Sequence, residues 1–481
     1  MTKILFFSLI AILLTSCATT PSGKVGYEFS QECKSKLANT LQLAESGIAA
    51  KQTSLGVMFN DGECTKQSYI NAKFWFEKAA SQNEIYALYN LGILYGNGRG
   101  VKLDYKKALE YFKRAAANGH PAANYNLGIY YDLGYGVSVD PKKALDYYRA
   151  GAILGDDMAQ YNLARSYEKG DIVPQDYVQA FEWYSKSAAQ GTYSDSINNL
   201  GVLYQSGTGV PKDVVKAAEL YRRAANLGNK ISQSNLAFKY ETGDGVEQNI
   251  ETAIALYKIS ANQGYAPAQR NLGKLYYDGK LCSQDIPKAF ELFRKAADQN
   301  DSQAQFLLGI AYGDVNKDEK QEFIWTKKAA ENGLASAQYN LGFKYITGKN
   351  ILKDYNAGLY WLNLAAKNGE TKALNMMGNF YAFERDGPRD YQRAIAFFRQ
   401  SAALRNTNGQ VNLGYLYQNG FGVDKNLIVA LALYKISNET KYIEFMEKIM
   451  THKQIEEADL LKMDMDKPNN ILEALDRFIA R

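Results

Sequence analysis

The chain has 481 residues, and its 56 Lys and Arg against 51 Asp and Glu give a formal net charge of +5. The two signs are interspersed without a basic run, which argues against a nucleic-acid-binding protein. Two histidines and four cysteines lack the spacing of metal ligands, and the sequence contains no phosphate loop or other cofactor motif. A chain this long would usually form several globular domains, unless its core grows by repetition.

The first 28 residues are expected to be a targeting segment. Lys3 precedes an apolar run from Ile4 to Leu14, which is too short to span a bilayer. The sequence Leu14-Thr15-Ser16-Cys17 is similar to the lipobox of bacterial lipoproteins, in which the cysteine becomes acylated. We therefore expect a signal peptide at 1–16, a lipid on Cys17 and a flexible tether over 17–28. The alternative is an ordinary secretory signal with a chance cysteine.

Residue 18 indicates where the protein would be anchored, and the cysteines other than Cys17 indicate whether the chain could form a disulfide. By the lipoprotein sorting rule, Ala18 favours the outer membrane, with the protein facing the periplasm. Residues 29–48 are predicted to be an N-terminal capping helix that covers the first repeat. An exported chain permits disulfides, so Cys33 in this cap and Cys64 could form one. Three buried thiols are the alternative.

The centre of the chain is built from one repeated unit, marked by the pair Leu91-Gly92. The residues equivalent to Leu91 follow at steps of 36, with one step of 37 and one of 33, and they are Leu55, Leu127, Leu163, Leu200, Leu236, Leu272, Leu308, Leu341, Met377 and Leu413. A constant period of this length is typical of a stacked-repeat solenoid.

Each unit predicts two helices separated by a glycine turn. Ala87, Leu91 and Tyr95 lie four apart and mark the apolar stripe of the first helix, while Ala108 and Phe112 mark the second. Glycine follows the marker leucine in nine copies, and a mid-helix glycine costs about 1 kcal/mol against alanine. The recurrence of this glycine therefore predicts a close helix–helix approach at that position.

These motifs resemble the SEL-one-like repeat, a longer-looped relative of the tetratricopeptide repeat. The pattern is Ala-x-x-Asn-Leu-Gly-x-x-Tyr, a Gly-x-Gly-Val turn, then Ala-x-x-x-Tyr/Phe-x-x-Ala-Ala-x-x-Gly, and it covers about 49–438. The resemblance implies an all-α, right-handed α/α superhelical solenoid of about eleven helix-turn-helix repeats. Residues 439–481 are expected to hold C-terminal capping helices, with a capping box at Thr451–Gln454 and a short last helix near Ile471–Ile479.

The resemblance also suggests where a partner would bind. In related solenoids the first helices line the concave face, and an asparagine preceding the marker leucine helps to clamp a bound peptide. The candidate residues here are Tyr89, Asn90, Tyr125, Asn126, Tyr161, Asn162, Asn199, Asn235 and Asn271. The alternative is that each asparagine bonds a neighbouring repeat and holds the stack together.

The expected function is a non-enzymatic, membrane-anchored periplasmic scaffold that binds a protein or peptide and requires no cofactor. One alternative is a surface-exposed or secreted virulence factor that binds host proteins. An alternative of another class is an envelope hydrolase acting on peptidoglycan or a β-lactam, for which the sequence offers no nucleophile motif.

Overall fold

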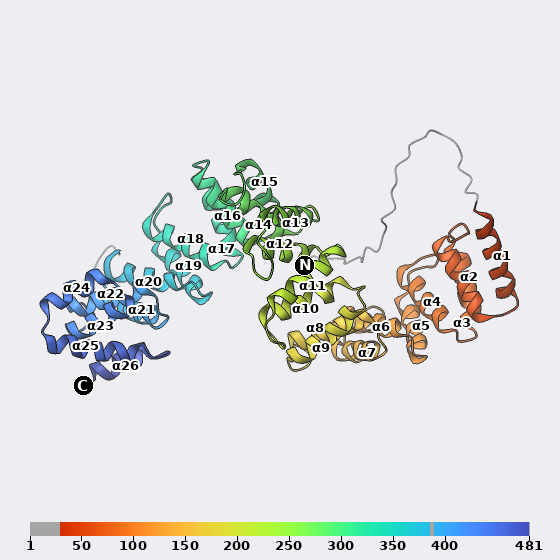
Figure 1. Cartoon of the computed structure of the whole chain (residues 1–481), viewed down its shortest axis with the longest axis horizontal. Helices are drawn as coiled ribbons and strands as arrows, with labels where there is room; N and C mark the ends of the chain where they lie inside the picture. The colour runs from red at the N-terminus through yellow and green to blue at the C-terminus, as the bar shows by residue number, and fades with distance from the viewer. Residues whose placement is uncertain (1–28, 385–388, 481) are drawn as a thin grey trace. The chain divides into compact units, whose positions relative to one another are not determined.

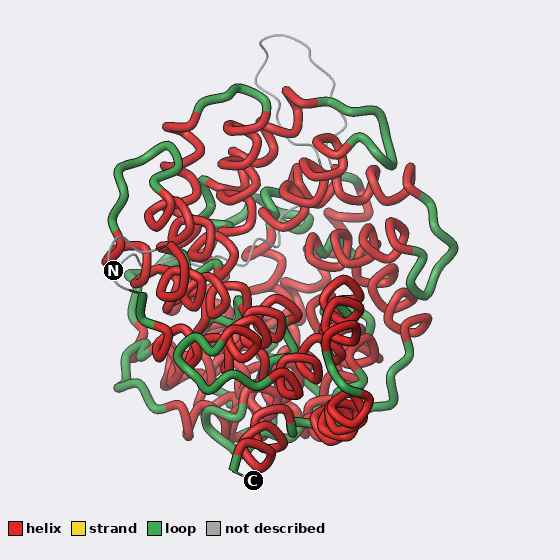
Figure 2. The backbone as a smooth tube through the Cα atoms, turned by 90° about the vertical axis from the view of Figure 1, so that its left-hand side faces the viewer, coloured by secondary structure: helices red, strands yellow, loops and turns green. Residues whose placement is uncertain are grey.

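A computed structural model of the chain describes residues 29–384 and 389–480 (Figure 1). These residues form helices joined by loops, and no strand occurs among them (Figure 2). The expected Cys17 and its tether lie outside the described residues. The chain divides into two compact units, Met1–Ser196 and Ile197–Arg481, which we call unit 1 and unit 2 and describe separately.

Unit 1 consists of a capping helix followed by helix pairs. Its helices are α1 (Gln31–Glu45), α2 (Ala49–Asp61), α3 (Tyr69–Ala80), α4 (Ile85–Asn97), α5 (Tyr105–Ala117), α6 (Pro121–Leu133), α7 (Pro141–Ile153), α8 (Asp157–Lys169) and α9 (Tyr177–Ala189). The even-numbered helices from α2 are the first helices of the repeats, and the odd-numbered helices from α3 are the second.

Helix α10 (Ser194–Ser206) begins the fifth repeat, and unit 2 continues the pattern. Its further helices are α11 (Val214–Asn226), α12 (Lys230–Thr242), α13 (Ile250–Asn262), α14 (Ala266–Asp278), α15 (Ile286–Ala297), α16 (Ser302–Asp314), α17 (Glu319–Glu331), α18 (Ala335–Thr347), α19 (Tyr355–Lys367), α20 (Thr371–Asn379), the π-helix η1 (Phe380–Glu384), α21 (Tyr391–Ala403), α22 (Thr407–Asn419), α23 (Leu427–Ser437), α24 (Thr440–Ile449), α25 (His452–Met465) and α26 (Ile471–Ile479). The prediction of an all-α repeat solenoid is confirmed.

In most repeats the core contains a large ring set against a glycine. Leu91 is fully buried, and a Cβ atom added to Gly92 would lie 2.5 Å from the Phe112 ring. The same clash recurs between Gly128 and Tyr148. The mid-helix glycine therefore allows the two helices of one repeat to approach closely, as the sequence predicted.

The glycine turn also joins successive repeats. Gly98 ends α4 in the left-handed conformation, at φ 65°. Gly100 has φ 66°, and a Cβ there would lie 2.5 Å from Tyr69 Cβ and 2.9 Å from its carbonyl carbon. The second glycine of the turn is thus the point where the loop packs on the start of the preceding repeat's second helix.

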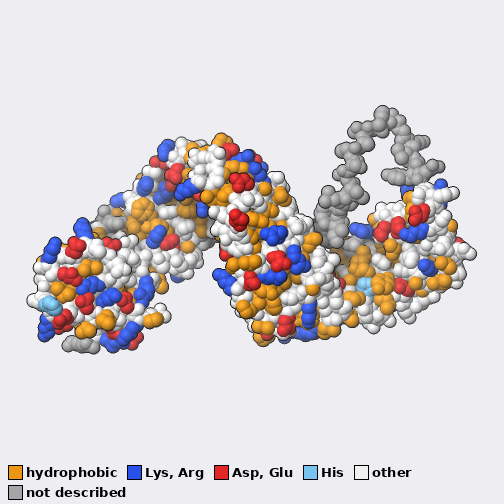
Figure 3. Space-filling model, viewed as in Figure 1, with side chains coloured by type: hydrophobic (Ala, Val, Ile, Leu, Met, Phe, Trp, Pro, Cys, Tyr) orange, Lys and Arg blue, Asp and Glu red, His pale blue; other side chains and the backbone are white. Residues whose placement is uncertain are grey.

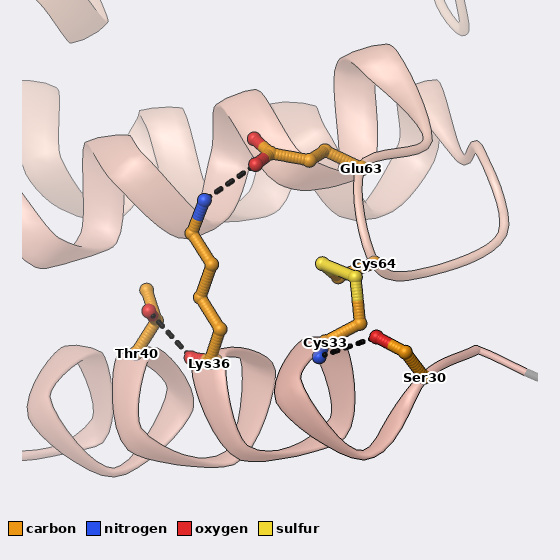
Figure 4. The surroundings of a disulfide bond; sticks show 6 residues. All are labelled: Ser30, Cys33, Lys36, Thr40, Glu63 and Cys64. Carbon is orange, nitrogen blue, oxygen red and sulfur yellow. Dashed lines mark hydrogen bonds and ion pairs between the residues drawn. A yellow bond between two sulfur atoms is a disulfide. The ribbon is translucent and has the colours of Figure 1, made fainter.

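The two ends of the chain are closed by different means. At the N-terminus a disulfide joins Cys33 of α1 to Cys64, which follows α2 (Figure 4). The nearby Lys36 Nζ lies 2.5 Å from a Glu63 carboxylate oxygen. At the C-terminus α25 begins with the capping box at Thr451 and Gln454, and α26 occupies the expected segment.

No helix in the described part is long and apolar enough to cross a bilayer.

Candidate partner-binding face

The first helices lie on the inner side of the stack in unit 1. Helix α2 contacts α4, and α6 contacts α8, more extensively than the second helices of successive repeats contact each other within the described ranges. Helices that approach one another more closely lie on the inside of a curved stack. We call the exposed side of α4, α6 and α8 the inner face.

The three candidate tyrosines of unit 1 form a column along this face. Each is half-buried, because its ring packs on an aromatic ring of the second helix in its own repeat. The ring-centroid distances are 5.8 Å for Tyr89–Phe112, 6.2 Å for Tyr125–Tyr148 and 5.7 Å for Tyr161–Tyr184. The helix pair therefore fixes the position of each tyrosine and leaves only part of the ring for a partner.

The candidate asparagines of unit 1 differ in their bonding. Asn126 Nδ2 donates to Tyr89 Oη at 3.4 Å and to the Ala122 carbonyl at 2.9 Å. Asn162 Nδ2 donates to the carbonyl of Met158 at 3.1 Å. Asn90 is half-buried and makes no side-chain hydrogen bond to any described residue. Asn90 is thus the member of the three best placed to bond a bound peptide.

In unit 2 the candidate asparagines also differ, and one of them bonds the neighbouring repeat. Asn235 Nδ2 donates to Asn198 Oδ1, one repeat earlier, at 3.2 Å. Asn199 Oδ1 accepts from Asn198 at 3.1 Å, and Asn271 Oδ1 accepts from Arg270 Nε at 3.3 Å. The Asn235 contact joins two repeats through side chains and not the backbone, whereas the Asn199 and Asn271 contacts each join adjacent residues of one helix.

A histidine that the sequence left without a role completes the face. His120 is 7% exposed, caps α6 by accepting from the Ala123 amide at 3.3 Å, and stacks on Tyr89 with a centroid distance of 4.2 Å. Tyr86, which is 62% exposed, packs edge-on against the same imidazole at 5.2 Å. We call Tyr86, Tyr89 and His120 the aromatic cluster. Its signal in the sequence is that His120 precedes Pro121, where other copies carry capping residues such as Asp156 and Asn229.

Burial keeps the polar groups of this face uncharged. It lowers the pKa of His120, and nearby Glu84 opposes that shift less strongly. Burial also raises the pKa of Tyr89, and it raises that of Tyr125 to about 12 with a smaller contribution from Asp156. At neutral pH the face therefore offers a neutral imidazole and protonated hydroxyls, which suit hydrogen bonding and stacking.

The rings beneath the face are held by part-buried hydrogen bonds that the sequence did not reveal. Tyr148 Oη donates to Asp132 at 2.6 Å, and Tyr184 Oη donates to Glu168 at 2.6 Å. The same geometry joins Tyr221 to Gln205, Tyr257 to Glu241 and Tyr434 to Gln418. Where the ring is Phe112 or Phe398, the equivalent position is Gly96 or Ala382, but Phe76 and Phe293 have Asn60 and Tyr277 there. Each of these five tyrosine hydroxyls therefore has an acceptor, although a polar residue at the partner position does not by itself indicate a tyrosine.

A second polar network connects consecutive helices. Gln160 Nε2 donates to the Ala152 carbonyl at 3.1 Å, and Gln190 Nε2 donates to Gln160 Oε1 at 3.0 Å. Equivalent side-chain pairs are Gln52–Gln82, Gln233–Gln263, Gln269–Gln299, Gln305–Asn332 and Gln338–Asn368. These bonds satisfy carbonyls at the ends of second helices and stiffen the scaffold that presents the inner face.

The surface of the protein carries both charges, which alternate over the face shown in Figure 3. Within the described ranges no group of three or more His, Cys, Asp or Glu is arranged to hold a metal ion.

Comparison with known proteins follows the repeat boundaries. The family model described as Sel1 repeat matches eleven segments, at 52–84, 85–120, 121–156, 157–192, 194–229, 230–265, 266–301, 302–334, 335–370, 371–406 and 407–439. The comparison with curated proteins gave no match.

Two solved structures are similar to this chain in sequence. The chain is 34% identical to c5321, described as a protective antigen present in uropathogenic Escherichia coli strains and displaying an SLR fold. That alignment covers 92% of this chain and 97% of the other, with a TM-score of 0.68. A Sel1 repeat protein from Oxalobacter formigenes is 31% identical over 51% of this chain and 99% of its own, with a TM-score of 0.45.

Proposed function

Since the chain belongs to the Sel1 repeat family, whose solenoids are typically protein-interaction scaffolds, we propose that it is a non-enzymatic, lipid-anchored envelope protein that binds a protein or peptide on its inner face. The observation that carries the proposal is the aromatic cluster. Tyr86 leaves most of its ring in solvent, and it lies beside a neutral imidazole and the unbonded amide of Asn90. Partly exposed tyrosines on a rigid support are typical of binding hot spots.

A pair of photocrosslinking variants tests the face. A crosslinking amino acid at position 86 is expected to give a discrete protein adduct in cells, because the ring position is exposed on the inner face. The matched control is position 70, where Ile70 is 71% exposed on α3, a second helix. Equal adducts from both positions, or an adduct from position 70 alone, would count against the inner face.

Substitution measures the energy at this face once the adduct is identified. Tyr86→Ala with Asn90→Ala is expected to weaken binding of the identified partner by about 30-fold, since a hot-spot side chain contributes about 2 kcal/mol. Ile70→Ala should leave the affinity unchanged. Helicity and melting temperature should stay constant, because neither side chain supports the core. Unchanged affinity in the double variant would refute the assignment.

The lipid anchor has its own test. Cys17→Ser should move the protein from the membrane fraction to the soluble periplasmic fraction, because two or more acyl chains are needed for stable anchoring. Cys282→Ser serves as the control for loss of a thiol. Membrane fractionation that is unchanged in Cys17→Ser would contradict an acyl anchor at that residue.

A second candidate places the same binding face on the outside of the cell. The likeness to c5321, which is described as a protective antigen, supports a position exposed to a host. Protease treatment of intact cells separates the two candidates, because a periplasmic protein survives it and a surface protein does not.

A further inference from the structure

A groove in unit 1, away from the inner face, is lined by four lysines. It has a volume of about 690 Å³ and lies between α3, the turn that follows α4, and the start of α5. We call it the lysine groove and define it by Lys73, Lys102, Lys106 and Lys107. The lining contains one carboxylate, Asp104, which caps α5 by accepting from the Lys107 amide at 3.0 Å.

The repeat fold does not require this charge. The position of Lys73 carries an apolar residue in the ten other copies, namely Leu109, Leu145, Phe181, Ala218, Ile254, Phe290, Phe323, Leu359, Ile395 and Leu431. The same groove one repeat later, of about 570 Å³, has Ser138 where the first has Lys102, and the charged residues in its lining are Lys142, Asp140 and Asp171. Lys73 and Lys102 therefore turn a periodic feature of the stack into a cationic one.

Two of the four lysines contact another side chain. Lys73 Nζ lies 3.5 Å from Glu77, which is the second acid near the groove, and Lys107 Nζ lies 4.3 Å from the centre of the Tyr95 ring. Lys102 and Lys106 are exposed and form no ion pair with any described residue. Four ammonium groups against Asp104 and Glu77 leave an excess of two positive charges at the groove, which a bound anion would offset.

We propose that the lysine groove is a binding site for a phosphate-bearing ligand. Lysine binds phosphate as a point charge, and a multiply charged anion can engage several ammonium groups together. The volume falls within the range of sites that hold small molecules or headgroups. The site is independent of the proposed inner-face function, since it uses none of the same residues.

The neighbouring groove supplies the design of the test variant. Lys73→Leu with Lys102→Ser gives the lysine groove the residues that occur at 109 and 138, so the variant should fold as the adjacent repeat does. The charge-matched control is Lys113→Leu with Lys169→Ser, which removes two exposed lysines elsewhere in unit 1. Binding of sodium tripolyphosphate to full-length protein is measured by calorimetry, and binding to phosphatidylglycerol vesicles is measured by flotation.

We expect at least one probe to bind the wild-type protein. Its affinity should fall about tenfold or more in the groove variant and less than about threefold in the control, and it should fall as the salt concentration rises. Tripolyphosphate binding identifies a soluble phosphate ligand, whereas vesicle binding alone identifies a lipid headgroup. The proposal is overturned if neither probe binds, or if the groove variant and the control lose affinity equally.

Discussion

Replacing Gly92 by leucine is expected to destabilise α4 and α5 by about 3 kcal/mol or more. The first added atom already lies 2.5 Å from the Phe112 ring, so the remaining atoms of a leucine can be placed only by separating the two helices. Stability in a repeat stack is local, so hydrogen exchange of the α4 and α5 amides is the measurement of choice. Amides in α21 to α23 should exchange at the wild-type rate.

Gly92→Ala is the matched control for this experiment. Two repeats carry alanine at the equivalent position, Ala164 and Ala237, opposite the large rings of Tyr184 and Tyr257. A single methyl group is therefore accommodated by a small shift, and alanine gains about 1 kcal/mol of helix propensity over glycine. We expect a net loss below about 1.5 kcal/mol. A leucine variant as stable as the alanine variant would refute the close-approach explanation.

Removing the disulfide is expected to release α1 from the stack. The bridge joins residues 31 apart, which corresponds to about 3.5 kcal/mol in the chain-entropy model. Helix α1 has one fully buried side chain, Ala44, so its other contacts contribute little. In Cys33→Ser/Cys64→Ser, limited proteolysis should cut within α1 while α4 to α9 remain intact.

Cys282→Ser is the control for the disulfide experiment, because this half-buried thiol is unpaired. Its proteolysis pattern should match that of the wild type. Protection of α1 that is equal in the double serine variant and the wild type would show that packing alone holds the cap.

The features that the sequence predicted well are those set by periodicity. The marker Leu91, the glycine beside it and the ring of Phe112 recur at equivalent positions in most copies, so spacing alone indicates the helix pair and its close approach. The N-terminal capping helix was expected over 29–48 and is observed as α1. Helix α24, between the last repeat and the capping box, was not predicted as a separate helix because the repeat pattern has ended there.

The features that it missed are polar contacts between residues distant in the chain. Gln160 and Gln190 are 30 residues apart, and glutamine on a helix usually marks a solvated surface. Asp132 likewise resembles a surface acid until Tyr148 is placed over it. Such pairs depend on the distance between helices, which a residue pattern does not contain.

The short eighth repeat shows how one irregularity is compensated. Realigning for its three missing residues puts Glu322 where nine of the ten other repeats carry a buried alanine. Gly313 leaves room for that side chain, and Lys344 of the next repeat lies 3.0 Å from its carboxylate. A buried cation is therefore matched by an acid one repeat earlier, and removing either partner would leave the other uncompensated.

The tyrosine column has a consequence for how such proteins diversify. The residue two before the marker is Tyr89, Tyr125 and Tyr161 in successive copies and then Asn198, Ser234 and Arg270, although the leucines beside it hardly change. Tyr89 and Tyr125 are partly exposed and pack on the second-helix ring of their own repeat, whereas Asn198 and Ser234 are buried. The same position can therefore hold a partly exposed ring in one repeat and a buried polar side chain in another without a change in the marker leucine, so the composition of the surface can vary along the stack.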